Sequence, residues 1–108
     1  MDQKRRVVVT GLGLISPLGN SVKTSWHSAI EGRSGAALIS KFDTENFLTK
    51  FGATVKDFEA LDCIDPKEAR RTDLFIQYGT AAAIEAINDS GFLEFYQLED
   101  IGVSVSSG

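Results

Sequence analysis

Two short stretches of the chain carry the hydrophobic pattern of β-strands. Three consecutive valines at residues 7–9 are followed by Gly11 and Gly13, as in a strand that is buried on both faces and leads into a tight turn. Over residues 101–106, apolar side chains alternate with small ones, which predicts a second strand. The first of these strands is expected to lie centrally in a parallel sheet.

Helical periodicity follows the first strand. Apolar residues recur at intervals of four from Val22 to Ile30, which places them on one face of a helix over residues 21–31. Asn20 is suited to cap the start of this helix, and Gly32 is suited to the left-handed conformation that ends it.

A second start signal precedes a longer helical region. Asp65 is suited to a helix cap, Pro66 to the first helical position and Glu68 to a capping box, so a helix is predicted to begin there. Another helix is predicted over residues 73–90, ended by Gly91. Its expected buried side consists of Phe75, Ile76, Gly79, Ala82, Ala83, Ala86 and Ile87.

Residues 33–62 have no long hydrophobic period. Phe42, Phe47 and Phe51 punctuate polar stretches, and residues 52–58 alternate weakly like a short strand. This segment is predicted to be an irregular excursion that packs over a larger body.

The order of these elements predicts an α/β fold class. A strand, a helix, the excursion, a helix pair and a second strand imply a crossover connection within a parallel sheet. Two parallel strands do not make a stable sheet, because such strands need covered faces and further neighbours. Residues 1–108 are therefore expected to open a larger α/β domain.

Composition narrows the class of protein. The 108 residues are 43% hydrophobic and 24% charged, as in ordinary folded proteins. The formal net charge of -4 argues against general binding of nucleic acid, whose backbone is also negative. The single cysteine allows no internal disulfide, and we find neither a signal peptide nor a membrane span. These features predict a soluble cytoplasmic protein.

A glycine turn is the first candidate for chemistry. Residues 8–13 (VVTGLG) place glycines after a strand, where a dinucleotide pyrophosphate can bind. This fingerprint is incomplete, because Ser16 stands at its third glycine position and no acidic residue ends a second strand about 20 residues later. The simpler interpretation is a tight turn in which Gly11 and Gly13 allow close packing that a side chain would block.

The single cysteine and the single histidine are weak candidates for catalysis. Cys63 lies in the sequence LDCID, whose acidic residues disfavour the reactive thiolate. No partner for His27 is marked in the sequence, and one Cys with one His does not supply the four ligands of a usual structural zinc site. We assign no catalytic, cofactor-binding or metal-ligating residue within the chain.

Three basic residues form the clearest candidate site. Lys67, Arg70 and Arg71 are spaced three and four apart, so they share one face of the second predicted helix. They could form a solvated helix face, with the neighbouring acidic residues as local partners. The residues by themselves favour this interpretation over a binding role. The alternative is a docking point for an acidic protein or a phosphate-bearing carrier.

Residues 5–20 (RRVVVTGLGLISPLGN) begin a set of sequence stretches that carries a family resemblance. The set continues in register through residues 32–35, 42–43, 50–53, 55–58, 73–79 and 89–91. Together these stretches resemble the β-ketoacyl-acyl-carrier-protein synthases, the condensing enzymes of fatty-acid elongation. The forms SPLG and FIQYG are more similar to the type II branch of that family than to type I.

This resemblance implies a thiolase-like fold of two related α/β halves, normally a homodimer, in which residues 1–108 begin the first half. It implies that an acyl chain moves from the phosphopantetheine arm of acyl carrier protein to a cysteine. Two histidines then assist while malonyl carrier loses carbon dioxide and the resulting carbanion attacks the thioester. These three catalytic residues would lie beyond Gly108, and neither Cys63 nor His27 matches one. The resemblance implies no bound cofactor, and an isolated 108-residue chain without activity.

The resemblance also changes the interpretation of the basic helix. Residues 66–71 (PKEARR) are similar to the helix that meets the acidic carrier protein in type II enzymes, and Lys67, Arg70 and Arg71 match its basic positions. Carrier docking is then favoured over a solvated face. Two alternatives stay open: a ketosynthase domain of a polyketide-making system, and a carrier-binding module without catalysis.

Overall fold

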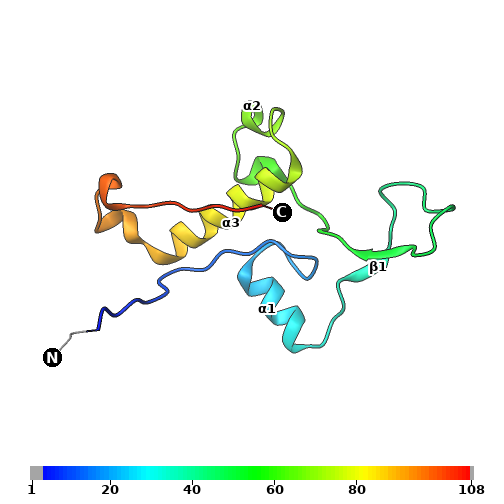
Figure 1. The fold of residues 1–108 in the computed structure, drawn as a ribbon, viewed down its shortest axis with the longest axis horizontal. Helices are drawn as coiled ribbons and strands as arrows, with labels where there is room; N and C mark the ends of the chain where they lie inside the picture. The colour runs from blue at the N-terminus through cyan, green and yellow to red at the C-terminus, as the bar shows by residue number, and fades with distance from the viewer. Residues whose placement is uncertain (1–3, 108) are drawn as a thin grey trace.

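A computed structural model describes residues 4–107 of the chain, which form α-helices, short 3-10 helices and one small sheet. The helices are α1 (Val22–Ile30), α2 (Pro66–Ala69) and α3 (Leu74–Ser90), and the strands are β1 (Ala36–Leu38) and β2 (Phe51–Ala53) (Figure 1). The 3-10 helices are η1 (Ala60–Asp62), η2 (Phe92–Glu94) and η3 (Leu98–Asp100).

The chain is elongated and open. Its radius of gyration is 17.7 Å and its principal extents are 62 × 37 × 24 Å, whereas a compact domain of this length has a radius of gyration of about 13 Å. Within residues 4–107 no hydrophobic residue is buried, and the two buried residues, Ser25 and Gln77, are polar. The described chain therefore lacks a hydrophobic core of its own.

Helix α3 contacts two segments from opposite parts of the chain, the glycine turn at residues 11–14 and the C-terminal residues 105–107 (Figure 1). The backbone N–H of Leu12 donates to Asp89 Oδ2 at 3.0 Å, and that of Leu14 donates to Glu85 Oε2 at 3.0 Å. Residues 105–107 line an apolar groove together with the other part of α3. Segments far apart in sequence are thus brought together by one helix.

Glu85 joins α3 to the start of α1 as well. Its second oxygen, Oε1, accepts a hydrogen bond from the backbone N–H of Val22 at 2.9 Å. The first N–H groups of a helix have no intrahelical acceptor, and a carboxylate is favourable there. One side chain therefore anchors both the turn after residues 7–9 and the N-terminus of α1.

The parallel crossover predicted from the sequence is not present in residues 4–107. Residues 7–9 and 101–105 are unpaired, and their valines are exposed, Val7 at 89% and Val105 at 85%. The only sheet in the described chain is antiparallel, with Ala36 opposite Ala53 and Leu38 opposite Phe51. A strand forms only where another backbone supplies hydrogen bonds, and here neither valine segment has such a neighbour.

The first predicted helix is confirmed, with a different cap. The side chain of Ser21, not that of Asn20, accepts from Thr24 N at 3.1 Å, and Thr24 Oγ1 in turn accepts from Ser21 N, which completes a capping box. Asn20 instead donates its side-chain amide to the carbonyl of Lys56 at 2.8 Å. Gly32 has the expected left-handed conformation, with φ of 69°.

The two later helices are also confirmed, although α2 is only one turn long. Asp65 caps α2 by accepting from Lys67 N at 2.8 Å, whereas no side-chain bond from Glu68 back to Asp65 is found in the described chain. Gly91 ends α3 with φ of 63°, the left-handed conformation that glycine adopts without steric penalty.

The predicted buried side of α3 is only partly covered. Ala82, Ala86 and Ile87 are half-buried, whereas the other predicted positions are exposed, namely Phe75, Ile76, Gly79 and Ala83. Residues 105–107 are the described segment that lies against this exposed part. The expectation was therefore wrong for these four positions in the described chain.

The last part of the excursion between α1 and α2 packs against the rest of the described chain, where Phe58 contacts Tyr78 and η1 contacts α3. Residues 39–50 form a loop that projects beyond β1 and β2 at one end of the molecule (Figure 1). The rings of Phe42 and Phe47 contact each other at a centroid distance of 5.9 Å, yet both remain exposed. The weakly alternating segment at residues 52–58 is strand only where β2 pairs with β1.

Candidate functional site

The candidate basic residues occupy the single turn of α2 and the two residues after it. Pro66 stands in the first turn, where a missing N–H is harmless, and the Asp65 carboxylate accepts from Lys67 N. The turn continues beyond α2, since Arg70 has helical angles and the backbone N–H of Arg71 donates to Glu68 O at 3.0 Å. Lys67, Arg70 and Arg71 therefore project from one continuous helical turn.

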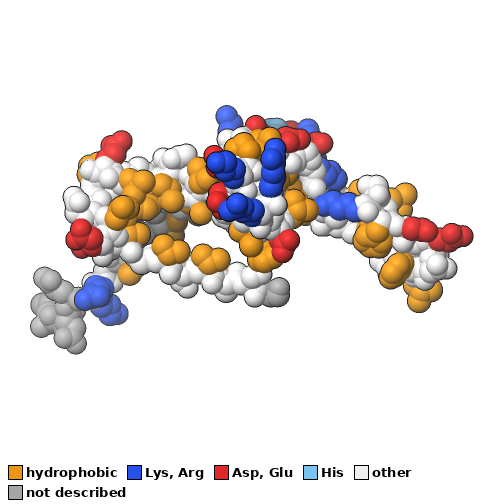
Figure 2. Space-filling view, turned by 90° about the horizontal axis from the view of Figure 1, so that it is seen from above, with side chains coloured by type: hydrophobic (Ala, Val, Ile, Leu, Met, Phe, Trp, Pro, Cys, Tyr) orange, Lys and Arg blue, Asp and Glu red, His pale blue; other side chains and the backbone are white. Residues whose placement is uncertain are grey.

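All three basic side chains are exposed, and none forms an ion pair with residues 4–107. Figure 2 shows Lys and Arg side chains gathered over the region of α2. The neighbouring acids that a solvated face would use, Asp65, Glu68 and Asp73, form no ion pair with them. The structure thus presents three uncompensated positive charges on a chain of net charge -4.

Helix α3 holds this basic turn in place. The side-chain amide of Gln77 donates to Ala69 O at 2.8 Å and to Thr72 O at 3.0 Å. The ring of Tyr78 meets that of Phe58 edge-on, at a centroid distance of 4.8 Å. These contacts were not predicted from the sequence; the available signal was a glutamine among the apolar residues that begin α3.

The glycine turn does not form a nucleotide site. The N–H groups of Leu12 and Leu14, which could otherwise meet a pyrophosphate, donate to the carboxylates of Asp89 and Glu85. A side chain at Gly13 would overlap the backbone of α3 at Ala82. The glycines therefore serve the close packing that the sequence suggested as the simpler interpretation.

Neither Cys63 nor His27 belongs to a cluster of catalytic or metal-binding side chains in the described chain. The Cys63 thiol is half-buried and contacts Ala60 O at 3.5 Å. His27 Nε2 lies 3.1 Å from the Glu31 carboxylate, one turn along α1. Within residues 4–107 no group of three or more His, Cys, Asp or Glu side chains could hold a metal ion.

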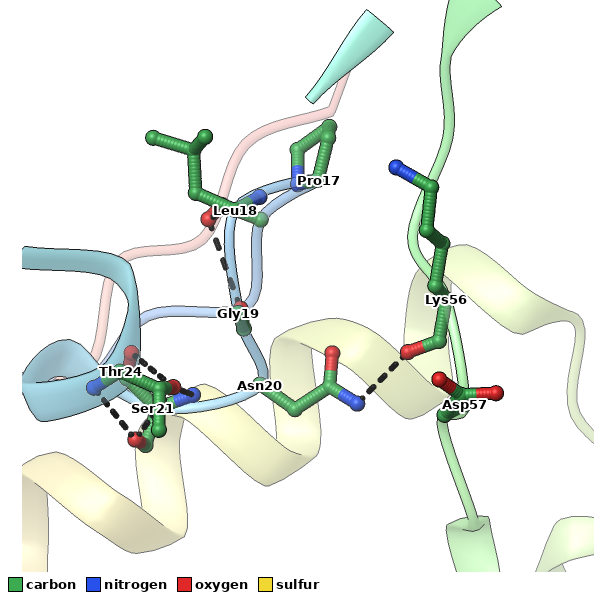
Figure 3. Close-up of a pocket in the computed structure, with 9 residues that line it drawn as sticks. Pro17, Leu18, Gly19, Asn20, Ser21, Thr24, Lys56 and Asp57 are labelled. Carbon is green, nitrogen blue, oxygen red and sulfur yellow. Dashed lines mark hydrogen bonds between the residues drawn. The ribbon is translucent and has the colours of Figure 1, made fainter. Parts of the chain in front are cut away.

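An open hollow of about 450 Å³ lies beside the N-terminus of α1. Figure 3 shows the Asn20 amide directed at the Lys56 carbonyl, while Ser21 and Thr24 bond to each other. The Lys56 amine donates to Gly35 O at 2.9 Å, and Asp57 has a left-handed φ of 53°. The side chains of Asn20, Ser21, Thr24 and Lys56 are engaged in holding the loop, and no nucleophile is paired with a base among the described residues that line the hollow.

None of the helices in residues 4–107 has the length and hydropathy needed to cross a membrane.

Comparison with known proteins relates the chain to one family. The family described as beta-ketoacyl synthase, N-terminal domain, matches residues 4–108. The chain is 50% identical over 107 residues to 3-oxoacyl-[acyl-carrier-protein] synthase 2 of Vibrio harveyi, covering 97% of this chain and 26% of that protein. It is 43% identical over 109 residues to the synthase of the same name from Staphylococcus aureus strain COL, covering 100% of this chain and 26% of that protein.

A solved structure leads to the same family. The ishigamide ketosynthase/chain length factor superposes with a TM-score of 0.67 at 37% identity, over 91% of this chain and 23% of that one. The chain spans about a quarter of the length of the curated relatives it matches. These similarities imply the thiolase-like fold of ketosynthases, and the chain belongs to the β-ketoacyl synthase family, in which it corresponds to the N-terminal domain.

Proposed function

We propose that residues 1–108 form the beginning of the first half of a fatty-acid condensing enzyme. The observation that carries this proposal is identity of 41% to 50% with bacterial proteins named 3-oxoacyl-[acyl-carrier-protein] synthase 2, over nearly the whole chain. In the complete protein, further strands would pair with residues 7–9 and 101–105 in the parallel sheet that this chain alone does not form.

The reaction of the complete protein would be a decarboxylative condensation. A cysteine thiolate takes the acyl group from the carrier thioester and releases the carrier thiol. Malonyl carrier then loses carbon dioxide, and its carbanion attacks the acyl-enzyme carbonyl, forming a carbon–carbon bond and releasing the thiolate. The cysteine and two histidines for these steps would lie outside residues 1–108. The role left to this part would be to bind the carrier protein and to position it.

The role proposed for this part is to dock acyl carrier protein through Lys67, Arg70 and Arg71. Their exposure and lack of ion-pair partners in the described chain leave their charge available to an acidic surface. Such complementarity accelerates encounter and sets orientation. The carrier would bring its phosphopantetheine-linked substrate, and the enzyme itself would bind no cofactor. The complete protein is proposed to be a cytoplasmic homodimer.

A polyketide-type ketosynthase is the second candidate function. The similarity to the ishigamide ketosynthase/chain length factor favours it, although identity there is 37% against up to 50% for the fatty-acid synthases. A condensation assay of the complete protein separates the two. Turnover with saturated acyl groups on a fatty-acid carrier supports the first candidate, and turnover restricted to polyketide carriers supports the second.

Reversing two charges tests the docking role. In the complete protein, Arg70→Glu combined with Arg71→Glu should weaken binding of acyl carrier protein about tenfold at low salt, because attraction at the turn becomes repulsion. The remaining affinity should depend less on salt concentration. Binding is measured by titration across a series of salt concentrations.

A matched control makes the same net change elsewhere. Lys23→Glu combined with Lys41→Glu alters two exposed cations remote in sequence from α2. This control should bind the carrier nearly as the unchanged protein does. Equal affinity and equal salt dependence for the two double variants would remove the docking role from α2.

A further inference from the structure

Gln77 is a buried polar residue whose side chain serves the basic turn. It is 8% exposed, whereas the residues before it on the first turn of α3 are exposed. Its Nε2 is the donor of both bonds described above, to Ala69 O and Thr72 O. Its backbone N–H also donates to Asp73 O, at 3.1 Å. A single residue of α3 thus holds the last carbonyl of α2 and two carbonyls of the connection between α2 and α3.

The two carbonyls held by the side chain flank Arg70 and Arg71 in the sequence. Carbonyls at the end of a helix have no intrahelical donor, and this shortage is acute in a one-turn helix such as α2. The Gln77 amide supplies two donors at this point, while Thr72 Oγ1 donates to Glu68 O at 2.9 Å. The backbone that carries the two arginines is therefore fixed from within α3.

We propose that Gln77 is the positioning residue of the carrier-docking turn, orienting Arg70 and Arg71 for an acidic partner. This proposal rests on the docking role proposed above. Without the amide, the connection samples other conformations, and only the fraction with correctly directed arginines binds the carrier. Gln77 itself touches no substrate.

Two variants of the complete protein test this role. Gln77→Met keeps the length of the side chain without its donors, and Gln77→Asn keeps the amide on a chain one methylene shorter. Each should raise KM for acyl carrier substrates about three- to tenfold, since two hydrogen bonds that hold the turn are lost or weakened. The control Gln97→Met changes an exposed glutamine whose side chain caps no helix.

The pattern of kinetic constants distinguishes positioning from general damage. With acyl carrier substrates, kcat should stay constant while KM rises. With a coenzyme A thioester, which has the same phosphopantetheine arm without an acidic protein, both constants should stay unchanged. Equal losses on both substrates, or a fall in kcat alone, would overturn the positioning role. Unchanged KM for the carrier in both variants would do so as well.

The charge-reversal variant, measured in parallel, separates this proposal from the docking role. If Arg70→Glu with Arg71→Glu leaves carrier binding unchanged, docking at α2 fails, and positioning fails with it. If that variant weakens binding but the Gln77 variants do not, positioning alone fails. A double-mutant cycle completes the test: Arg70→Ala should weaken binding less in the Gln77→Met background than in the unchanged protein.

Discussion

The isolated 108-residue chain is expected to self-associate and to unfold without a cooperative transition. Its accessible surface is 9470 Å², compared with about 5,900 Å² for a compact monomer of this size. Burial of apolar surface is the main favourable contribution to folding, and no hydrophobic residue in the described range is buried. Two chains that cover each other's apolar surfaces would gain what one chain lacks.

The segments without strand partners are the surfaces through which the isolated chains are expected to associate. Residues 7–9 and 102–105 expose both β-branched side chains and backbone groups without strand partners, which readily pair with another chain. Sedimentation velocity over a range of concentrations should show growing oligomers, and calorimetry should show a broad or absent transition. The complete protein is the control, and it is expected to sediment as a homodimer.

A compact monomer at all concentrations with a sharp thermal transition would contradict this expectation, because these residues would then form a core by themselves. The same sample tests a separate point. Carbon–carbon bond formation by the isolated chain, free of intact enzyme, would contradict the proposal that the catalytic residues lie outside it.

The helices were predictable because their signals are local. The caps and stops of α2 and α3, Asp65 and Gly91, depend on backbone groups within a few residues of each signal. The error at α1 had a distant cause: Ser21 and Asn20 are both good caps, but the Asn20 side chain bonds to Lys56, which lies 36 residues later. Distant partners are not visible in a local pattern.

The strands were not predictable, because each strand needs a partner that is distant in the sequence. The valines at residues 7–9 have the correct pattern for a buried strand, but a pattern does not supply the neighbouring backbone. The sheet that does form uses Ala36–Leu38, a segment without a strand signal, because Phe51–Ala53 comes alongside it. Pairing over such separations depends on the whole chain, whereas helices depend on adjacent turns.

The charged residues of the candidate site could be predicted from the sequence, but the contacts that hold them in place could not. The spacing of Lys67, Arg70 and Arg71 was sufficient to place them on one turn, and the structure leaves them exposed. The contribution of Gln77 was not evident, because a glutamine in a helix is usually an exposed residue. Glu85 was missed similarly, since its bonds to Leu14 and Val22 span more than 60 residues.

A side chain at Gly13 is expected to destabilise the complete protein by about 3 kcal/mol, because the obstacle is backbone and cannot rotate away. In the structure, the added Cβ would overlap the carbonyl oxygen of Ala82 on α3. The segment would have to move outward, which would stretch the bond from Leu14 to Glu85 and so loosen α1, whose first turn shares that carboxylate. The change is Gly13→Ala, and its effect on the free energy of unfolding is measured by denaturant titration.

A second substitution separates backbone overlap from side-chain crowding. Ala82→Gly removes the side chain of the residue that the new Cβ would overlap but leaves its carbonyl oxygen in place, and by itself should cost about 1 kcal/mol of helix stability. Combined with Gly13→Ala, it should therefore give no rescue, and the two losses should add. Recovery of stability in the double variant would show that the α3 backbone is not what Gly13 accommodates. Additive losses would identify Gly13 as the point where the turn after residues 7–9 meets α3, the helix whose Gln77 bonds to the basic turn.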